Sequence, residues 1–480
     1  MAYIKGNRNQ MTMLPNSIED YISLDDPVRA YDAFVEALDL EQLGLVLDGH
    51  QAGANAYWPQ ALLKLLLYGY AYGLRSSRKL ERACHHNLSF IWLTEGLKPD
   101  YRTIARFRVE NRAVLKQILQ QCARMCVKLE LVEGNTLFTD GTKIKANASY
   151  DQSWSQEDCR RWEEKVAQNI EHILAECEKT DEQEEPCSSL VKLKEELASQ
   201  EALRQKIEAI KKELDDSGKS SYNTTDPECF VSKADRGANV YHNAQMSVDE
   251  KHGLIITAQV VSESSDVNQL DAQVKQAQEV LGKPPQTVCA DAGYHSISDI
   301  EKIDSTIRVV VPSETQIVKE RRPANVKPFF KEAFSYDEAK DEYRCPADKC
   351  LTRTRQPAFD KKDRVVYKAA AGECRACSHF GVCTTSRAGR KIVRLKNEAL
   401  LQTLAQNYLS DEGQRIYKLR KQKVELPFAH FKHNFNLRQF LLRGVDKVNA
   451  EFNLCAIAYN ITRMIGIVGI DGLKTAFAIT

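Results

Sequence analysis

The segment Asn135–Ile144, NTLFTDGTKI, decides the fold class, because an apolar strand here ends at Asp140 and a glycine follows the acid. A second short apolar strand, Gln286–Ala290 (QTVCA), ends at Asp291. Sites in open α/β sheets form at the ends of strands, which is where both acids lie. Each acid, taken alone, also fits an ordinary turn or capping residue.

The residues around these strands complete an α/β pattern. VYHNAQMSV (240–248) and LIITAQVV (254–261) flank the turn DEKHG and predict a β-hairpin. We expect a helix over Asn268–Leu281 and another strand over Thr306–Val311. Helices return from about Glu398 to Ile467.

Helical segments precede and interrupt this core. Residues 18–132 carry apolar side chains at helical spacing, and Ser76-Ser77 and Pro99-Asp100 resemble helix starts. Short helices separated by turns suit a bundle with helix-turn-helix character. Residues 156–216 predict a helical hairpin with two apolar seams, one through Val166, Ile170, Ile173 and Cys177, the other through Leu203, Ile207, Ile210 and Leu214, with the bend at Pro186, Ser188 and Ser189.

The third informative acid, Glu425, lies in a basic helical stretch, RIYKLRKQKVELPFAHFKHNF. Pro427 either kinks this helix or marks its start. On a straight helix, Lys432 lies two turns from Glu425 on the same face. Phosphate contacts explain such a concentration of cations, although a solvated salt-bridged face remains the alternative. The cations of residues 418–443 are Lys418, Arg420, Lys421, Lys423, Lys432, Arg438 and Arg443.

Three carboxylates suit metal-dependent phosphodiester chemistry. Mg²⁺ prefers carboxylate and water oxygens and is held by few protein groups. Two such ions neutralise the scissile phosphate, activate a hydroxyl and stabilise the leaving oxygen.

Residues 320–395 look irregular, basic and rich in cysteine. The pair Cys374-Arg-Ala-Cys377 has the spacing of a zinc knuckle, and Cys345 and Cys383 complete a preferred ligand set. Cys350 can replace one of these ligands, and reduced thiols without metal are the alternative. We also expect the edge that follows to contact the DNA backbone, through Arg387, Arg390, Lys391, Arg394 and Lys396.

The bulk composition is that of a soluble globular protein, with 43% hydrophobic and 28% charged residues and a net charge of +1. No run of 18 apolar residues occurs, so we expect no membrane span, and no signal peptide is evident. The 14 cysteines of a long chain favour free thiols or a metal site over disulfides. We therefore expect a cytoplasmic protein.

Three blocks, TLFTDGTKIKANAS, VCADAGYHS and VELPFAHFKHNFNLRQFLLRG, resemble the acid-bearing blocks of bacterial insertion-sequence DDE transposases. The upstream helical stretch, from YWPQALL to RTIARFR, is similar to the N-terminal domain of one branch of that family. The resemblance implies a ribonuclease-H-like fold, Mg²⁺ or Mn²⁺ as cofactor, and double-stranded DNA as partner, both the terminal inverted repeats of the element and the target. It also implies a homo-oligomer on nucleoid-associated DNA.

The same resemblance assigns roles to residues. Asp140, Asp291 and Glu425 fall on the catalytic triad, and Lys432 falls on a lysine that contacts the transposon-end phosphate. The family pattern has Tyr and Arg seven and four residues before the Glu. Lys418 and Lys421 occupy those positions here, with Tyr417 and Arg420 one place earlier.

Further DNA contacts are expected outside the triad. Tyr294 is placed to stack on a displaced base near the cleavage site. Phosphate or base contacts also fit basic residues at spacings of four on two N-terminal helices, with a solvated basic face as the alternative. These cations are Arg75, Arg78, Lys79, Arg82, Arg102, Arg106 and Arg108.

The expected architecture is an α/β ribonuclease-H-like core with an N-terminal all-helical domain, a helical-hairpin insertion and a small zinc-ribbon-like insertion. Besides a transposase, two hypotheses remain open: a host nuclease of the same fold without strand transfer, and a DNA-binding regulator that has lost its chemistry. The expected boundaries are 1–132 for the helical domain, 133–155 and 221–318 for the core, 156–220 for the hairpin, 319–396 for the cysteine-rich insertion and 397–480 for the C-terminal helical part.

Overall fold

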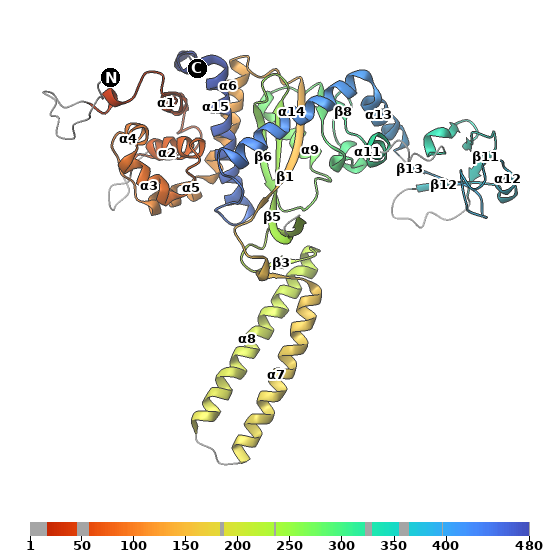
Figure 1. Cartoon of the computed structure of the whole chain (residues 1–480), viewed down its shortest axis with the longest axis horizontal. Coiled ribbons are helices and arrows are strands. Elements are labelled where there is room, and N and C mark those ends of the chain that lie inside the picture. The colour runs from red at the N-terminus through yellow and green to blue at the C-terminus, as the bar shows by residue number, and fades with distance from the viewer. Residues whose placement is uncertain are drawn as a thin grey trace, which may run out of the picture. The chain divides into compact units, whose positions relative to one another are not determined.

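The computed structural model describes residues 17–45, 57–182, 187–234, 237–321, 329–354, 364–395 and 397–479 (Figure 1). The chain divides into two compact units. Unit 1 comprises residues 1–266, 275–285 and 421–480, and unit 2 comprises residues 267–274 and 286–420. Two helices, α9 (Leu270–Leu281) and α14 (Asp411–His433), contribute to both units.

Unit 1 begins with helices, as the spacing of its apolar residues predicts. Asp100 caps α5, since its carboxylate accepts the backbone N–H of Arg102 at 2.8 Å and that of Thr103 at 3.1 Å. Ser77 is the first residue of α3, so both predicted helix starts are confirmed. The helices are α1 (Val28–Glu36), α2 (Pro59–Ala71), α3 (Ser77–His86), α4 (Leu88–Leu93), α5 (Tyr101–Glu110) and α6 (Arg112–Lys128).

The strands of unit 1 form an antiparallel ladder around the predicted hairpin. The central strand β5 pairs with β1, β4 and β6, and Asp140 on β1 lies opposite Met246 on β5. All residues from Val240 to Asp249 of β5 are buried, so both faces of this central strand are covered. The bounds are β1 (Thr136–Lys145), β4 (Phe230–Ala234), β5 (Gly237–Asp249) and β6 (Ile255–Val261).

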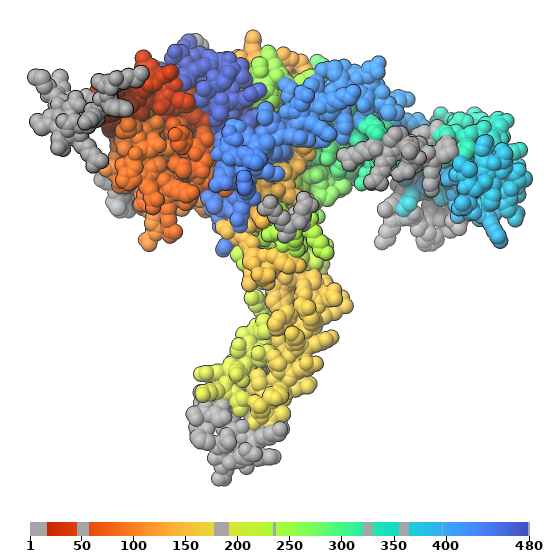
Figure 2. Space-filling view, viewed as in Figure 1, coloured from red at the N-terminus to blue at the C-terminus, as the bar shows by residue number. Residues whose placement is uncertain are grey.

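Two long helices, α7 (Gln156–Glu182) and α8 (Cys187–Ser217), lie side by side as a hairpin within unit 1 (Figure 1). Figure 2 shows its outer surface in yellow. A short ladder of β2 (Ser153–Trp154) and β3 (Tyr222–Asn223) closes its base. Pro186 lies outside the described residues, whereas Ser188 and Ser189 lie within α8. The buried seam is Cys159, Val166, Ile207, Ile210 and Leu214.

The last helix, α15 (Val445–Ile479), is apolar and long enough to cross a membrane by length and composition alone. It packs against α1, α2, α6 and β6. Phe452, Ile457 and Ile461 are fully buried there. The packing is that of a core helix of unit 1.

Unit 2 contains a parallel strand pair and a second, five-stranded sheet. The predicted strands after the helix α9 are confirmed as β7 (Thr287–Cys289) and β8 (Arg308–Val310), which pair in parallel. Three helices accompany them: α10 (Ile297–Ile300), α11 (Glu314–Arg321) and α13 (Glu398–Leu409).

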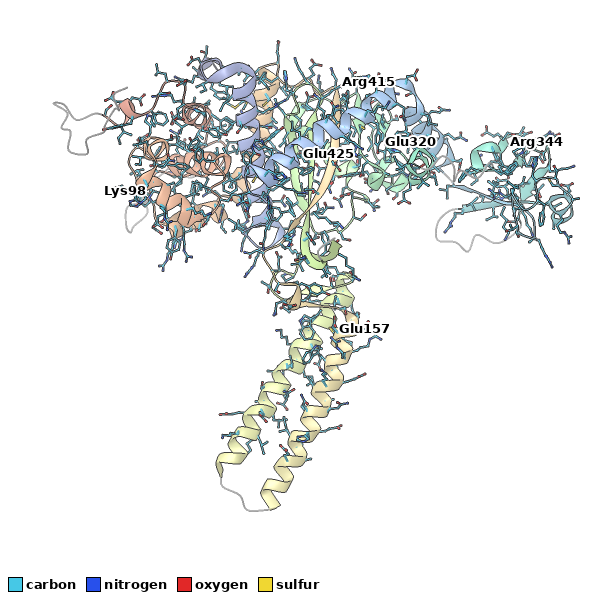
Figure 3. All side chains as sticks on the ribbon, in the orientation of Figure 1. Lys98, Glu157, Glu320, Arg344, Arg415 and Glu425 are labelled. Atoms are coloured by element: carbon cyan, nitrogen blue, oxygen red, sulfur yellow. The ribbon has the colours of Figure 1, made fainter. Side chains whose placement is uncertain are left out.

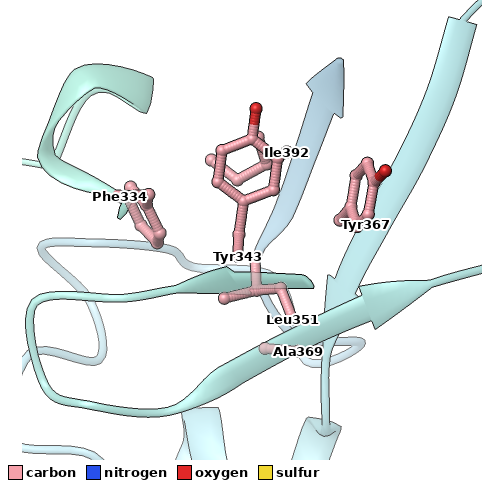
Figure 4. Packing of buried hydrophobic residues seen from close by; sticks show 6 residues of the cluster. All are labelled: Phe334, Tyr343, Leu351, Tyr367, Ala369 and Ile392. Atoms are coloured by element: carbon pink, nitrogen blue, oxygen red, sulfur yellow. The ribbon is translucent and has the colours of Figure 1, made fainter. Parts of the chain in front are cut away.

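The second sheet corrects the expectation that residues 320–395 are irregular. Five antiparallel strands occur in the order β13-β12-β11-β10-β9. An aromatic core covers one face, with Tyr343, Leu351 and Tyr367 nearly or fully buried (Figure 4). The elements are β9 (Ser335–Asp337), β10 (Glu342–Arg344), β11 (Cys350–Arg353), β12 (Arg364–Ala369), α12 (Ala371–Arg375) and β13 (Lys391–Leu395).

Truncation of the hairpin seam tests its role in holding α7 and α8 together. Ile207 is fully buried in the seam, so Ile207→Ala should reduce local stability by about 2–4 kcal/mol. Amide hydrogen exchange should accelerate in both helices. The matched change at an exposed neighbour, Lys206→Ala, should leave exchange unchanged, and equal effects of the two variants would contradict the packing.

Candidate catalytic centre

The Asp140 region of unit 1 is built by β1 and the second half of α14. Side chains alternate along a strand, so Asp140 and Thr142 point to the same face of β1. On that face, the Lys432 ammonium donates a hydrogen bond of 2.7 Å to the Thr142 hydroxyl. Burial lowers the pKa of Lys432, and the charge of Asp140 opposes that shift. A half-buried cation therefore lies beside the first acid.

The glycine after Asp140 is required by close packing on the opposite face of β1. A Cβ at Gly141 would lie 2.6 Å from the Asp266 carboxylate and nearer still to the Gln245 amide. Gln245 and Asn243 both donate to that Asp266 carboxylate, at 2.6 and 2.9 Å. The Asp-Gly pair of the sequence thus has a steric cause.

Glu425 lies in the middle of α14, with an exposed side chain (Figure 3). Pro427 lies inside this helix, so it does not mark the helix start as one reading of the sequence allowed. Lys432 follows Glu425 by seven residues, about 10.5 Å along the axis and on nearly the same face. The helix therefore presents Glu425 and Lys432 in one direction.

The Asp291 region belongs to unit 2. Asp291 lies two residues after the end of β7, and its carboxylate accepts the backbone N–H of Gly293 at 2.8 Å. Tyr417 on α14 is close enough to interact with it electrostatically: burial raises the pKa of Tyr417, Arg420 lowers it and Asp291 raises it. The Arg420 guanidinium lies over the Tyr417 ring at 5.4 Å.

Two residues expected to contact DNA are buried in unit 2. Tyr294 has no exposed surface, so its ring does not face a displaced base as we expected. Arg420 is only 7% exposed and stacks on Tyr417, which uses its cationic face inside the protein. Both residues are corrected to structural roles. The sequence could not show this, because tertiary packing buries both.

Three other expected cations around Glu425 remain at the surface. Lys421, Arg438 and Arg443 are exposed. Arg438 donates to the Lys432 carbonyl at 3.4 Å, and Arg443 donates to the Asn147 carbonyl at 2.8 Å. Their backbone anchors hold these two guanidinium groups near the end of β1.

The N-terminal cations separate into an exposed and a buried set. Arg78, Arg82, Arg102 and Arg106 are exposed on α3 and α5, and these two helices pack together. Tyr101 joins them, with the Arg78 guanidinium 5.0 Å and the Arg102 guanidinium 5.8 Å from its ring centroid. We call Arg78, Arg82, Arg102, Arg106 and Tyr101 the α3–α5 patch.

Arg75 and Arg108 are buried and contradict our expectation of a seven-residue DNA-binding set. Arg108 donates to the Tyr70 hydroxyl at 2.8 Å and to the Arg75 carbonyl at 3.1 Å. Arg75 forms an ion pair with Glu451, which is fully buried. Sequence reasoning missed Glu451 altogether, since its partner is 376 residues away.

In the cysteine-rich sheet of unit 2, four thiols line one small cavity of about 30 Å³: Cys345, Cys374, Cys377 and Cys383. Three of the sulfurs accept backbone N–H groups: Cys345 from Lys349 (3.3 Å), Cys374 from Arg390 (3.4 Å) and Cys377 from His379 (3.5 Å). The fifth cysteine, Cys350, lies outside this cavity with its sulfur 3.6 Å from the Glu342 carboxylate.

The cations that follow the cysteines also separate. Arg390 donates to the carbonyls of Cys383 and Phe329, and Arg394 lies over the Tyr336 ring at 3.5 Å. These two stabilise the fold and correct the expectation that the whole run faces DNA. Arg387 and Lys391 are exposed, and Lys396 lies outside the described residues.

The expected metal ligands therefore lie in three places: Asp140 and Glu425 in unit 1, Asp291 after β7 in unit 2, and the cysteines in the five-stranded sheet of unit 2. Over the described ranges, no three His, Cys, Asp or Glu side chains already form a group that could hold a metal ion.

Two models of known protein families match parts of the chain. A family model described as a transposase DDE domain matches residues 344–465, which contain Glu425 and Lys432. A second model, described as a transposase domain, matches residues 16–110, which contain the α3–α5 patch. Asp140 and Asp291 lie outside both matches, and no curated protein matches the chain.

These matches agree with a mixed helix-and-sheet protein that begins with helices, and a DDE domain implies a ribonuclease-H-like core. They agree with the function expected from the three acid-bearing blocks, and nothing in them favours the nuclease or regulator hypotheses. Together the two matches support an insertion-sequence DDE transposase, an enzyme that cuts and rejoins DNA.

Proposed function

We propose that Asp140, Asp291 and Glu425 are the catalytic triad of this transposase and bind Mg²⁺ or Mn²⁺. The main support for this proposal is the order of Tyr417, Glu425 and Lys432 along α14. Glu425 follows Tyr417, which lies near Asp291, by eight residues and precedes Lys432, which lies beside Asp140, by seven. One helix thus carries Glu425 between segments that border each aspartate.

The donor chemistry fits the proposed cofactor. Three carboxylates supply the hard oxygen ligands that Mg²⁺ prefers and leave positions open for phosphate. Bound there, two ions would supply charge neutralisation at the scissile phosphate and activation of the attacking hydroxyl. The role of the chain is to hold the carboxylates that would bind these ions.

The cations around the triad have distinct proposed roles. Lys432 binds the phosphate at the transposon end, since its amino group is held next to Asp140. Lys421, Arg438 and Arg443 contact the DNA backbone beyond it, because all three are exposed. Cleavage at the ends is followed by attack of the freed 3′-hydroxyl on target DNA, which needs no covalent protein intermediate.

The triad is tested by replacing each acid and measuring Mg²⁺-dependent cleavage of DNA that carries the element's ends. Asp140→Ala, Asp291→Ala and Glu425→Ala should each reduce cleavage by roughly a thousandfold, since metal stabilisation is worth several kcal/mol.

The matched control is Glu412→Ala, an exposed acid on the same helix that pairs with Arg415. It should retain near-native cleavage. Native activity in any of the three triad variants would contradict the assignment.

We propose that the α3–α5 patch binds the terminal inverted repeats. Four exposed arginines on two packed helices supply the charge for phosphate contacts, and Tyr101 supplies a planar surface between two of them. Arg offers planar, forked donors that suit both phosphates and guanine edges.

Arg78→Ala combined with Arg106→Ala tests the patch. Losing two phosphate contacts should lower the slope of log affinity against log salt by about two. Gel-shift titration of end DNA at several salt concentrations measures this slope. Lys116→Ala, an exposed cation on α6, is the control, and an unchanged slope in the double variant would refute the patch.

We propose a structural Zn²⁺ in the cysteine-rich sheet, held by Cys345, Cys374, Cys377 and Cys383. All four line the same cavity, and three of the sulfurs accept backbone N–H groups, which stabilise thiolate charge. The thiols would close around the ion and order a domain whose apolar core is small.

Metal analysis of the purified full chain should find about one zinc ion per chain, as four ligands suffice for one structural site. Cys377→Ser should lose that zinc and lower the Tm. Cys350→Ser should keep both, because Cys350 lies outside the cavity. Zinc-free native protein, or zinc loss in Cys350→Ser alone, would overturn the ligand set.

Assembly and location complete the proposal. Two element ends must be joined in one complex, so we propose a homo-oligomer on DNA in the bacterial cytoplasm. The hairpin of α7 and α8 suits protein rather than DNA contacts, because residues 156–217 carry 18 Asp and Glu against 10 Lys and Arg. We also keep the proposed domain boundaries: 1–132, 133–155 with 221–318, 156–220, 319–396 and 397–480.

A further inference from the structure

The turn between α2 and α3 packs closely against the segment that follows α14, and both belong to unit 1. Gly73 in this turn has φ +74°, and a Cβ there would lie 2.9 Å from the Asn434 carbonyl oxygen. The turn can therefore approach the C-terminal end of α14 only without a side chain at this position. Arg75, two residues after Gly73, also contacts the segment that follows α14.

Arg75 makes two contacts with that segment and one with α15, while it is only 8% exposed. Its guanidinium donates to the Asn436 carbonyl at 2.7 Å, to the Gln439 carbonyl at 2.9 Å and to the Glu451 carboxylate at 2.5 Å. A charged group at that depth is stable only with such partners, so the three contacts form one unit.

Glu451, on α15, also binds the segment that follows α14. One carboxylate oxygen faces Arg75, and the other accepts the backbone N–H groups of Leu441 at 2.9 Å and Leu442 at 3.2 Å. Asn436–Leu442 is thus fixed by an ion pair whose two members come from α15 and from the N-terminal helices.

The fixed segment in turn extends the end of β1. The Phe440 N–H donates to the Lys145 carbonyl at 2.9 Å, and the Gln439 amide donates to the Ala146 carbonyl at 3.0 Å. On its other side the segment continues α14 directly after Lys432, whose carbonyl accepts from Arg438. The ion pair therefore fixes the segment that joins the Asp140 strand to the Glu425 helix.

We propose that Arg75 and Glu451 are positioning residues that couple the N-terminal helical domain to the catalytic edge of unit 1. Arg75 lies three residues before Arg78 of the α3–α5 patch. DNA bound to that patch therefore acts on the turn between α2 and α3 that contains Arg75. Through Asn436–Leu442, the turn sets the positions of Lys432 and the end of β1. Neither residue contacts DNA or metal, since both side chains are buried. This inference rests on the proposed function of the α3–α5 patch.

Arg75→Lys keeps the charge but loses the forked contact to two carbonyls and the carboxylate. We expect it to reduce the rate of end cleavage by about tenfold to a hundredfold, because small displacements at a catalytic centre have effects of that size. Its affinity for end DNA should stay within about twofold, since the patch itself is intact.

The matched control is Arg29→Lys. Arg29 is equally buried, with one ion pair to Glu19 and bonds of 2.9 Å to the carbonyls of Ile22 and Ser23, but it contacts neither α14 nor Asn436–Leu442. We expect Arg29→Lys to lower the Tm by about as much as Arg75→Lys does. We expect its rate of end cleavage to remain native. A second variant, Glu451→Gln, should lose cleavage as Arg75→Lys does, with faster hydrogen exchange at Leu441 and Leu442.

Each outcome decides between the claims. Equal cleavage loss in Arg75→Lys and Arg29→Lys at equal Tm would show a purely structural role and overturn the coupling. Native cleavage in Arg75→Lys and Glu451→Gln, or loss of end binding in either, would also overturn it. If native protein fails to bind end DNA, the proposed function of the patch fails instead. If either variant does not fold, the exchange rates and cleavage of the other decide.

Discussion

The contact of Lys432 with β1 is the interaction on which the proposed catalytic geometry depends. Its ammonium reaches Thr142, two residues beyond Asp140, and is half-buried there. An amino group gives up hydration to lie there, and the charge of Asp140 compensates for part of that loss. This contact fixes the rotation of α14 on the strand, and with it the direction of Glu425.

The rest of unit 1 supports that contact. Gly141 allows Asp266 and Gln245 to pack behind the strand, so β1 cannot shift toward them. Arg75 and Glu451 hold the segment after α14, and α15 buries the whole arrangement against the N-terminal helices. Unit 2 contributes Asp291 at the end of β7 and Tyr417 and Arg420 on the first half of α14. The helix α14 is therefore the covalent link between the two groups of residues.

The sequence predicted the parts of this fold whose signals are local. Asp100 caps a helix through the backbone amides of Arg102 and Thr103. The apolar run before Asp140 predicted β1, but the strand continues to Lys145, so Asp140 lies within it and not at its end as expected. The five short strands of residues 335–395 escaped prediction, because each has only three to six residues and its exposed face is charged.

The sequence also failed to predict which charged residues are buried. Arg75, Arg108 and Arg420 look like surface cations in the sequence, and their partners are set by tertiary packing. The exposed cations Arg78, Arg82, Arg102 and Arg106 could be picked out only once the structure showed which members of the run face outward. The resemblance of three acid-bearing blocks identified the family from residues alone, and the family matches support it.

The central claim is that three acids from distant parts of the chain bind the same ions. A crystal structure of the full chain with end DNA and Mn²⁺ tests it directly, because anomalous scattering locates each ion independently of the model. The account predicts Mn²⁺ peaks at the scissile phosphate, with oxygens of Asp140, Asp291 and Glu425 all within about 2.0–2.2 Å, near the Mg²⁺–oxygen distance. Ions bound at the phosphate without one of these three carboxylates would contradict it.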